Sequence, residues 1–124
     1  MKLENYNQFH VPAAPFVMLQ VSSIDSTQSI EITALIDTGA DQTSIHTSII
    51  ARLNSQLGGE VCLESATGIS TFPTAFVRLT VEGLTPVDLP VVAWNFSEYA
   101  ILGRDFLNCF KLTMDGPNLL FSIE

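Results

Sequence analysis

The chain has 124 residues, which is enough for one compact domain spanning residues 1–124 and leaves little room for a second. Apolar residues make up 47% of it, which is sufficient to fill a core. Thirteen acidic residues oppose five basic ones and give a net charge of −8, which argues against nucleic acid or an anionic membrane surface as a partner.

The cysteine content and the start of the chain favour an intracellular protein. Cys62 and Cys109 are too few for a disulfide framework and form no Cys-x-x-Cys motif, so we expect two buried free thiols. Residues 1–7 lack the apolar stretch of a signal peptide, and no apolar run reaches the length of a membrane span.

Strand patterns dominate the chain. Residues 16–22 are rich in β-forming side chains, and residues 29–36 alternate between apolar and polar ones after a short polar link, which predicts a hairpin. Pro90 interrupts a later apolar run, which is typical of an edge strand. Runs of the same kind predict further strands at residues 43–45, 60–64, 71–82, 87–94, 110–114 and 119–123.

Turn and helix signals separate these strands. Residues 58–59 and residues 115–118 are rich in glycine or turn formers and predict turns. Thr47 or Ser48 is expected to cap a short helix, and residues 104–109 can hold one or two helical turns. The fold class that follows is all-β, a small closed structure with one short helix near the C-terminus.

The sharpest chemical signal is Asp37, which stands directly after the apolar pair Leu35 and Ile36. Burying a carboxylate is costly unless it is paired, so its place at the end of an apolar strand needs a reason. Gly39 lets the backbone turn tightly and leaves space beside the carboxylate, and the Thr38 hydroxyl can hold the loop rigid. The tripeptide alone is compatible with a plain turn, but its setting predicts a carboxylate presented at the bottom of a cleft.

A second motif lies at residues 100–107, where two apolar residues precede a Gly-Arg-Asp sequence. Together with residues 35–41, it resembles the retroviral-type aspartic peptidases, the retropepsins and their cellular relatives. That family carries apolar-apolar-Asp-Thr-Gly-Ala-Asp in its first third and apolar-apolar-Gly-Arg-Asp/Asn-apolar-Leu near its end. The resemblance covers residues 16–107, and residues 65–70 match the expected flap hairpin. It implies a small closed all-β barrel of the retropepsin type that hydrolyses peptide bonds.

The resemblance assigns a role to each residue of the first motif. Asp37 would be the catalytic carboxylate, and Thr38 would hydrogen-bond across a dimer to the other loop. Gly39 would present its carbonyl to a substrate amide, and Asp41 would bind substrate backbone further out. Arg104 would pair with Asp41 inside the subunit. Support of the site is implied for Ala40, Gly103 and Arg104, and further substrate contacts are implied for Ala66, Thr67, Gly68, Ile69, Tyr99 and Ile101.

The chemistry of this family calls for a homodimer. Hydrolysis by this route needs two carboxyl groups that share a proton, one acting as general base on water and the other as general acid on the carbonyl oxygen. The chain holds one Asp-Thr-Gly, and a duplicated second lobe would not fit in 124 residues. A two-fold axis would supply the second Asp37. We expect no cofactor, and we expect the tail from Phe110 onward to join the dimer-forming sheet.

Other interpretations compete with an active peptidase. A non-catalytic retropepsin-like dimer that binds peptides or serves as a scaffold is one, and it would be favoured by a degenerate triplet, which this chain does not have. An unrelated β-domain with coincidental motifs is another. A metal site built from Asp37, Asp41 and His46 matches no zinc spacing, so we expect no metal.

Overall fold

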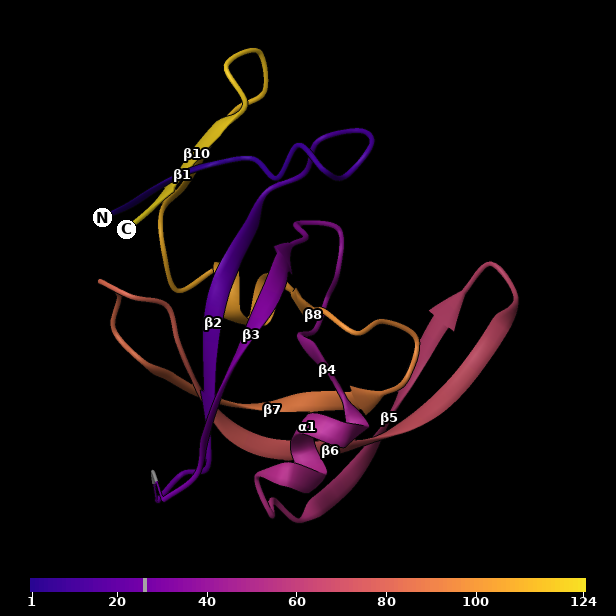
Figure 1. The fold of residues 1–124 in the computed structure, drawn as a ribbon. Coiled ribbons are helices and arrows are strands. Elements are labelled where there is room, and N and C mark those ends of the chain that lie inside the picture. Colours follow the sequence, from indigo (N-terminus) through magenta and orange to yellow (C-terminus); the bar gives the residue numbers. More distant parts are fainter. Residues whose placement is uncertain (26) are drawn as a thin grey trace.

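The computed structural model describes residues 1–25 and 27–124 and is built mainly of strands (Figure 1). In chain order the elements are β1 (Lys2–Asn5), β2 (Phe16–Ser22), β3 (Ser29–Ile36), β4 (Ser44–His46), α1 (Thr47–Arg52), β5 (Leu57–Ser65), β6 (Gly68–Thr80), β7 (Val87–Trp94), β8 (Ala100–Leu102), α2 (Arg104–Leu107), β9 (Leu112–Asp115) and β10 (Leu120–Ile123). The predicted helix near the C-terminus is α2, and the short helix expected at Thr47 or Ser48 is present as α1. Within the described part of the chain, no helix has the length and apolar character needed to cross a membrane.

Seven strands form one sheet that closes on itself. Their order is β2-β3-β8-β4-β7-β6-β5, and β2 also pairs with β6. This second pairing is antiparallel and sets Gln20 opposite Thr80. The β2–β6 pairing thus closes the sheet into a small barrel, and this closure leaves few unpaired strand edges. The predicted all-β closed barrel is therefore confirmed.

Apolar side chains at alternating positions fill the barrel. On β2, Leu19 and Val21 are fully buried, whereas Met18 faces outward. The same alternation buries Val77 and Leu79 on β6. Since successive side chains of a strand point to opposite faces, a slip of one residue would expose this whole set, and the alternation thus fixes the register.

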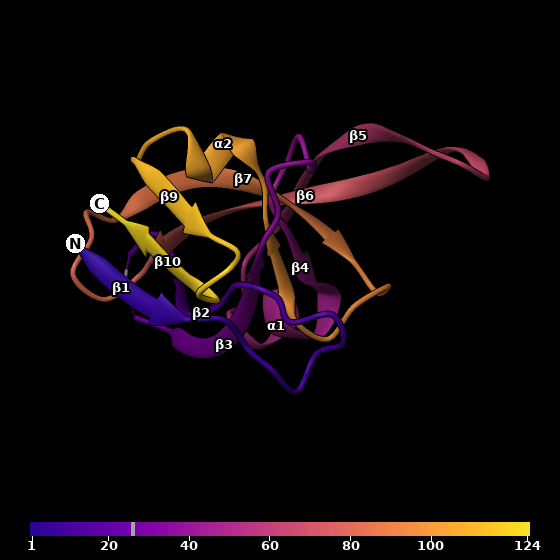
Figure 2. The same ribbon diagram turned by 90° about the horizontal axis from the view of Figure 1, so that it is seen from above.

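The β5–β6 hairpin extends beyond the rest of the molecule (Figures 1 and 2). Its strands are longer than predicted, because Gly58 and Gly59 lie inside β5 at a register irregularity and not in a turn. The turn at the tip is short, since Ser65 pairs with Gly68. Gly68 has a φ of 126°, a conformation that favours glycine.

The two ends of the chain meet in a separate three-stranded sheet (Figure 2). The predicted tail hairpin is present as β9 and β10, and β1 pairs with β10 on its other side. We did not predict β1, because its four residues have no strand pattern of their own and owe their conformation to this pairing. Phe121 and Ile123 of β10 are buried and join the barrel core.

Two local predictions need correction. The cap of α1 is His46, whose ring Nδ1 accepts a 3.1 Å hydrogen bond from the backbone N–H of Ser48, and not Thr47 or Ser48. Pro90 is not on an edge strand, because β7 lies between β6 and β4. In the described pairing β4 contacts only residues 92–94 of β7. Pro90 therefore has no β4 partner to which a backbone N–H would have to donate, and a proline is tolerated there.

Both cysteines are exposed, which contradicts the expectation of buried thiols. Cys62 lies on the protruding hairpin, where its Sγ faces the Thr71 hydroxyl oxygen at 3.8 Å. Cys109 follows α2. Each occupies a segment that leaves the barrel, so neither position could be assigned to the core from the apolar pattern alone.

Candidate active site

The two sequence motifs meet at the ends of two parallel strands. β3 and β8 pair in parallel, with Ile36 opposite Leu102. The backbone N–H of Asp37 extends this ladder by donating to the carbonyl of Leu102 at 3.0 Å. Because both strands run the same way, the Asp37 loop and the segment that begins at Gly103 emerge side by side.

Asp37 stands partly exposed at the start of a tight loop. The N–H of Gly39 donates to Asp37 Oδ1 at 2.9 Å, and the N–H of Ala40 donates to the Asp37 carbonyl at 3.2 Å. A Cβ on Gly39 would lie 3.3 Å from Asp37 Oδ1. The backbone of Gly39 is outside the left-handed region, so its conformation does not call for glycine. The reason for glycine here is the predicted space beside the Asp37 carboxylate.

Arg104 joins the two motifs. Its Nη1 donates to the carbonyl of Thr38 at 2.8 Å, and its Nη2 pairs with the carboxylate of Asp41. Its backbone N–H donates to the carbonyl of Ala40 at 2.9 Å. The expected ion pair is thus present. Because the Asp41 side chain is 80% exposed, water screens the charges, and the main effect of the pair is to fix the loop's position.

A partly buried hydrogen-bond network behind the loop was not predicted. The backbone N–H of Thr43 donates to both carboxylate oxygens of Asp105 at 3.0 Å, and the Thr43 hydroxyl donates to Oδ1 at 2.7 Å. The same hydroxyl accepts from the N–H of Gly103 at 3.1 Å, and Phe106 N–H donates to Asp105 Oδ1 at 2.8 Å. The one sequence feature that could have indicated this network is Asp105, a carboxylate in the first turn of α2, where it can accept hydrogen bonds from backbone N–H groups.

Gly103 allows the two segments to approach closely. Its φ of −89° is open to any residue, so its backbone does not require glycine. A Cβ there would lie 2.6 Å from the carbonyl carbon of Gln42 and 2.7 Å from its oxygen. The glycine of the second motif is therefore explained by contact with the loop that follows Asp37.

The four predicted hairpin residues lie together at the tip of the β5–β6 hairpin. Ala66 and Thr67 form the turn, and Gly68 and Ile69 begin β6, all of them exposed. Both views show this tip well separated from the end of β3, which Asp37 follows (Figures 1 and 2). The structure thus brings the two motifs together, and it does not bring the hairpin tip to them.

Tyr99 and Ile101 flank the start of β8 and are partly buried. The Tyr99 ring packs edge-on against Phe16, with centroids 5.1 Å apart, and against His10 at 5.8 Å. His10 lies in the segment that leads into β2 and Phe16 is the first residue of β2, and their sequence gave no sign of this contact. The aromatic group at the predicted pocket wall is therefore larger than Tyr99 alone.

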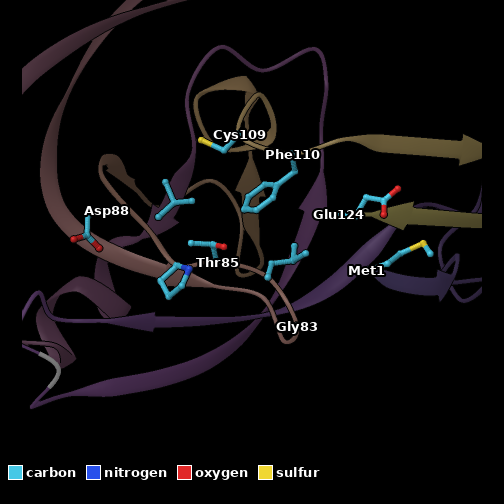
Figure 3. A pocket seen from close by; sticks show the side chains of 10 residues that line it. Met1, Gly83, Thr85, Asp88, Cys109, Phe110 and Glu124 are labelled. Atoms are coloured by element: carbon cyan, nitrogen blue, oxygen red, sulfur yellow. The ribbon is translucent and has the colours of Figure 1, made fainter.

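A surface hollow of 690 Å³ lies elsewhere (Figure 3). It is lined by residues 83–88 together with Met1, Cys109, Phe110 and Glu124, none of which was predicted for the site. Among the residues that the structure describes, no group of three or more His, Cys, Asp or Glu side chains could hold a metal ion.

The family of the chain follows from a sequence comparison. A family model described as retroviral aspartyl protease matches residues 12–115. The chain therefore belongs to the retroviral aspartyl protease family. A search of curated proteins gave no match.

Solved structures show the same fold. The chain is similar to a retropepsin-like aspartic protease from Rickettsia conorii, with a TM-score of 0.67 and 13% identity over 97% of this chain and 86% of that one. The chain is also similar to EIAV protease complexed with the inhibitor HBY-793, with a TM-score of 0.59 and 21% identity over 77% of this chain and 86% of that one. For Simian Foamy Virus (mac) protease the TM-score is 0.52, with 15% identity over 73% of this chain and 91% of that one. Identities this low show the retropepsin fold alone.

Proposed function

We propose that this chain is an aspartic endopeptidase that acts as a homodimer, with Asp37 of each subunit at the catalytic centre. The observation that carries the proposal is the joined pair of motifs. The Asp-Thr-Gly loop is intact, Asp37 Oδ1 is held by the N–H of Gly39, and Arg104 braces the loop from the second motif. Membership of the retroviral aspartyl protease family supports the same chemistry.

The mechanism needs a two-fold axis beside the Asp37 loop. Two carboxyl groups a few ångströms apart do not both ionise readily, so the pair would share one proton. The ionised carboxylate would take a proton from water, which attacks the carbonyl carbon of the peptide bond. The protonated carboxyl would donate to the carbonyl oxygen. Breakdown of the tetrahedral species would then move a proton to the leaving nitrogen and restore the shared-proton pair.

Substrate contacts are proposed from the residues around this centre. The Gly39 carbonyl and the Asp41 carboxylate would bind the peptide backbone, and Tyr99 and Ile101 would line side-chain pockets. The hairpin tip, residues 66–69, would cover the bound peptide. Because the tip stands apart from the Asp37 loop in the single chain, the cleft would be complete only with a partner subunit and a closed hairpin.

The three-stranded terminal sheet is the proposed main dimer contact. β1 and β9 are its two outer strands, and unpaired strand edges readily add another strand. On β1, Leu3 is 67% exposed, which is unusual for a large apolar residue in a sheet. Two copies related by a two-fold axis could cover both the edges and this side chain. Thr38 of each subunit would then hydrogen-bond to the opposite loop.

A non-catalytic dimer of the same fold that binds peptides or acts as a scaffold is the second candidate. The open position of the hairpin tip, which stands well apart from the end of β3 in both ribbon views, favours it (Figures 1 and 2). The two candidates differ in one outcome, because both would bind peptides and only the first would cut them.

The experiment is digestion of a peptide library, with and without pepstatin, by wild type and by Asp37→Asn. Asn keeps the shape of the side chain but cannot cycle a proton, so we expect activity to fall more than about a hundredfold in a dimer that stays folded. Glu31→Gln, on the exposed outer side of β3, is the matched control and should keep full activity. Near-normal cleavage by Asp37→Asn would reject the catalytic assignment, and a wild type that binds peptides without cutting them would favour the second candidate.

A further inference from the structure

Three aromatic rings lie together at the base of the β5–β6 hairpin. The ring centroid of Phe72 is 6.0 Å from that of Trp94 and 5.6 Å from that of Phe96, and the last two are 5.5 Å apart. Their planes cross at angles between 81° and 83°, which is the edge-to-face geometry that aromatic pairs favour. We call these three residues the aromatic hinge cluster.

The aromatic hinge cluster marks the point where the hairpin leaves the barrel. β6 pairs with β7 as far as Thr74, which lies opposite Val92. Continuing this register would set Phe72 opposite Trp94, but the described β6–β7 pairing ends before these two residues. On their other edges, β6 goes on pairing with β5 and Trp94 pairs with β4. The two rings therefore meet where the next rung of the ladder would be.

The cluster is not part of the barrel core. Side chains alternate along a strand, so Phe72 projects on the same side of β6 as Arg78, the side opposite the buried Val77. Phe72 is only partly buried, and Phe96 is 70% exposed. Core filling thus gives no reason for three aromatic residues at this place.

The cluster also reaches toward the predicted substrate pocket. Phe96 belongs to residues 95–99, which join β7 to β8 and end in Tyr99. The Ser97 hydroxyl donates to the carbonyl of Tyr99 at 3.0 Å, which holds the end of this segment. β8 then leads directly to the second motif. A shift of the hairpin at Phe72 would therefore displace Phe96, and with it the segment that carries Tyr99.

We propose that the aromatic hinge cluster positions the β5–β6 hairpin over the cleft and couples its closing to the segment that carries Tyr99. Phe72, Trp94 and Phe96 act as positioning residues, because they touch neither Asp37 nor the proposed scissile bond. The inference rests on the proposed function, since it gives the hairpin the task of covering a bound peptide.

The first experiment does not depend on catalysis. Amide hydrogen exchange is measured in wild type, in Phe96→Ala and in Phe72→Leu, with Phe76→Ala as the matched control. Phe76 is an exposed phenylalanine on the same strand and outside the cluster. We expect exchange in residues 60–73 to become about tenfold faster in the two cluster variants, with the barrel strands unchanged, because each variant loses aromatic pair contacts at the hinge. The control should match wild type.

Trp94 supplies an internal probe, because it is the one tryptophan in the sequence. Its emission should shift to longer wavelength in both cluster variants and stay unchanged in Phe76→Ala. With a peptide chosen from the library digest, KM should rise about tenfold in Phe96→Ala while kcat changes little, since the chemistry at Asp37 is untouched.

The outcomes separate this inference from the proposed function. Unchanged hairpin exchange in both cluster variants, or unchanged Trp94 emission, would overturn the hinge assignment even if the protein cleaves peptides. A wild type without peptidase activity would reject the proposed function, and the exchange experiment would still decide whether the cluster positions the hairpin. A fall in kcat with KM unchanged in Phe96→Ala would also count against a positioning role.

Discussion

The guanidinium of Arg104 donates a 2.8 Å hydrogen bond to the backbone carbonyl of Thr38. The same group pairs with the carboxylate of Asp41, so one side chain from the second motif holds two points of the Asp37 loop. A planar guanidinium can serve both acceptors at once, whereas an ammonium group acts as a single point charge. The position of the loop, and with it the direction of Asp37, therefore depends on arginine and not on positive charge alone.

Arg104→Lys should for this reason lower kcat/KM about tenfold or more and weaken the dimer, although the charge is kept. Arg104→Ala should be more severe, because it also leaves Asp41 without its partner. Activity on one peptide and sedimentation velocity at low concentration check both effects. Arg52→Lys, at the exposed end of α1, is the control and should behave as wild type. Normal turnover by Arg104→Lys would show that the loop does not rely on the double contact.

Gly103→Ala should destabilise the fold by about 1–3 kcal/mol, because the added methyl would overlap the backbone of Gln42. Gly59→Ala is the matched control, since a Cβ there meets nothing within 4 Å. Chemical denaturation of both variants measures the difference. If the two proved equally stable, the close approach of Gly103 to Gln42 would not be a tight constraint.

Thr43→Val tests the partly buried network behind the loop. Valine keeps the shape of the side chain but removes the hydroxyl that donates to Asp105 and accepts from Gly103, so Asp105 loses a partly buried hydrogen bond and Gly103 a buried one. We expect a loss of about 1–3 kcal/mol in the free energy of unfolding. Thr43→Ser keeps the hydroxyl and should lose much less. Equal losses in the two variants would assign the effect to packing and not to the hydrogen bonds.

The strand and turn patterns predicted the all-β class, and the resemblance to the retropepsins implied that the two motifs meet through Arg104 and Asp41. Asp37 and Gly103 each stand at the end of a short apolar strand, and such strands belong inside a sheet. The space required beside the Asp37 carboxylate also followed from the position of Gly39. The strands and the space beside Asp37 depend on short-range patterns, which one sequence displays directly, whereas the contact between the motifs was available only through the family resemblance.

Features that depend on distant partners could not be predicted in this way. β1 exists because it pairs with β10, and the Thr43–Asp105 network joins residues far apart in the chain. The aromatic hinge cluster likewise forms because β6 leaves β7 where Phe72 meets Trp94. Neither local propensity nor hydrophobic period contains such information. The exposure of Cys62 and Cys109 was missed because their number and spacing, from which free thiols were expected, say nothing about where the chain leaves the barrel.

Leu3→Glu should separate the proposed dimer into folded monomers. The side chain is largely exposed in one subunit, so the fold should tolerate the change, whereas a two-fold contact would bring two buried negative charges together. Leu57→Glu, at an exposed leucine on β5, is the control. Sedimentation equilibrium gives the dissociation constant, and we expect it to rise at least about tenfold for Leu3→Glu alone. A dimer of unchanged affinity would place the interface away from the terminal sheet.

Arg78 and Asp88 face each other across β6 and β7, with Nε 2.7 Å from Oδ1 and Nη2 2.9 Å from Oδ2. The hydrogen bonds from Arg78 lower the pKa of Asp88 below its ordinary value. A carboxyl group with a lowered pKa contributes stability that is present above its pKa in the unfolded chain and is lost as the pH falls through the folded-state pKa. Asp88 should therefore stabilise the protein at neutral pH and cease to do so in acid.

Asp88→Asn should accordingly lower the Tm at neutral pH by a small amount, because the pair is solvent-screened. The difference from wild type should shrink as the pH is taken below about 4, where the carboxyl of the unfolded chain becomes protonated. Differential scanning calorimetry of both proteins across this range measures it. In a double-mutant cycle, adding Asp88→Asn to Arg78→Gln should cost less than Asp88→Asn alone, since the partner is already gone. A Tm difference of the same size in acid and at neutral pH would mean that the pair has no part in the pH dependence of stability.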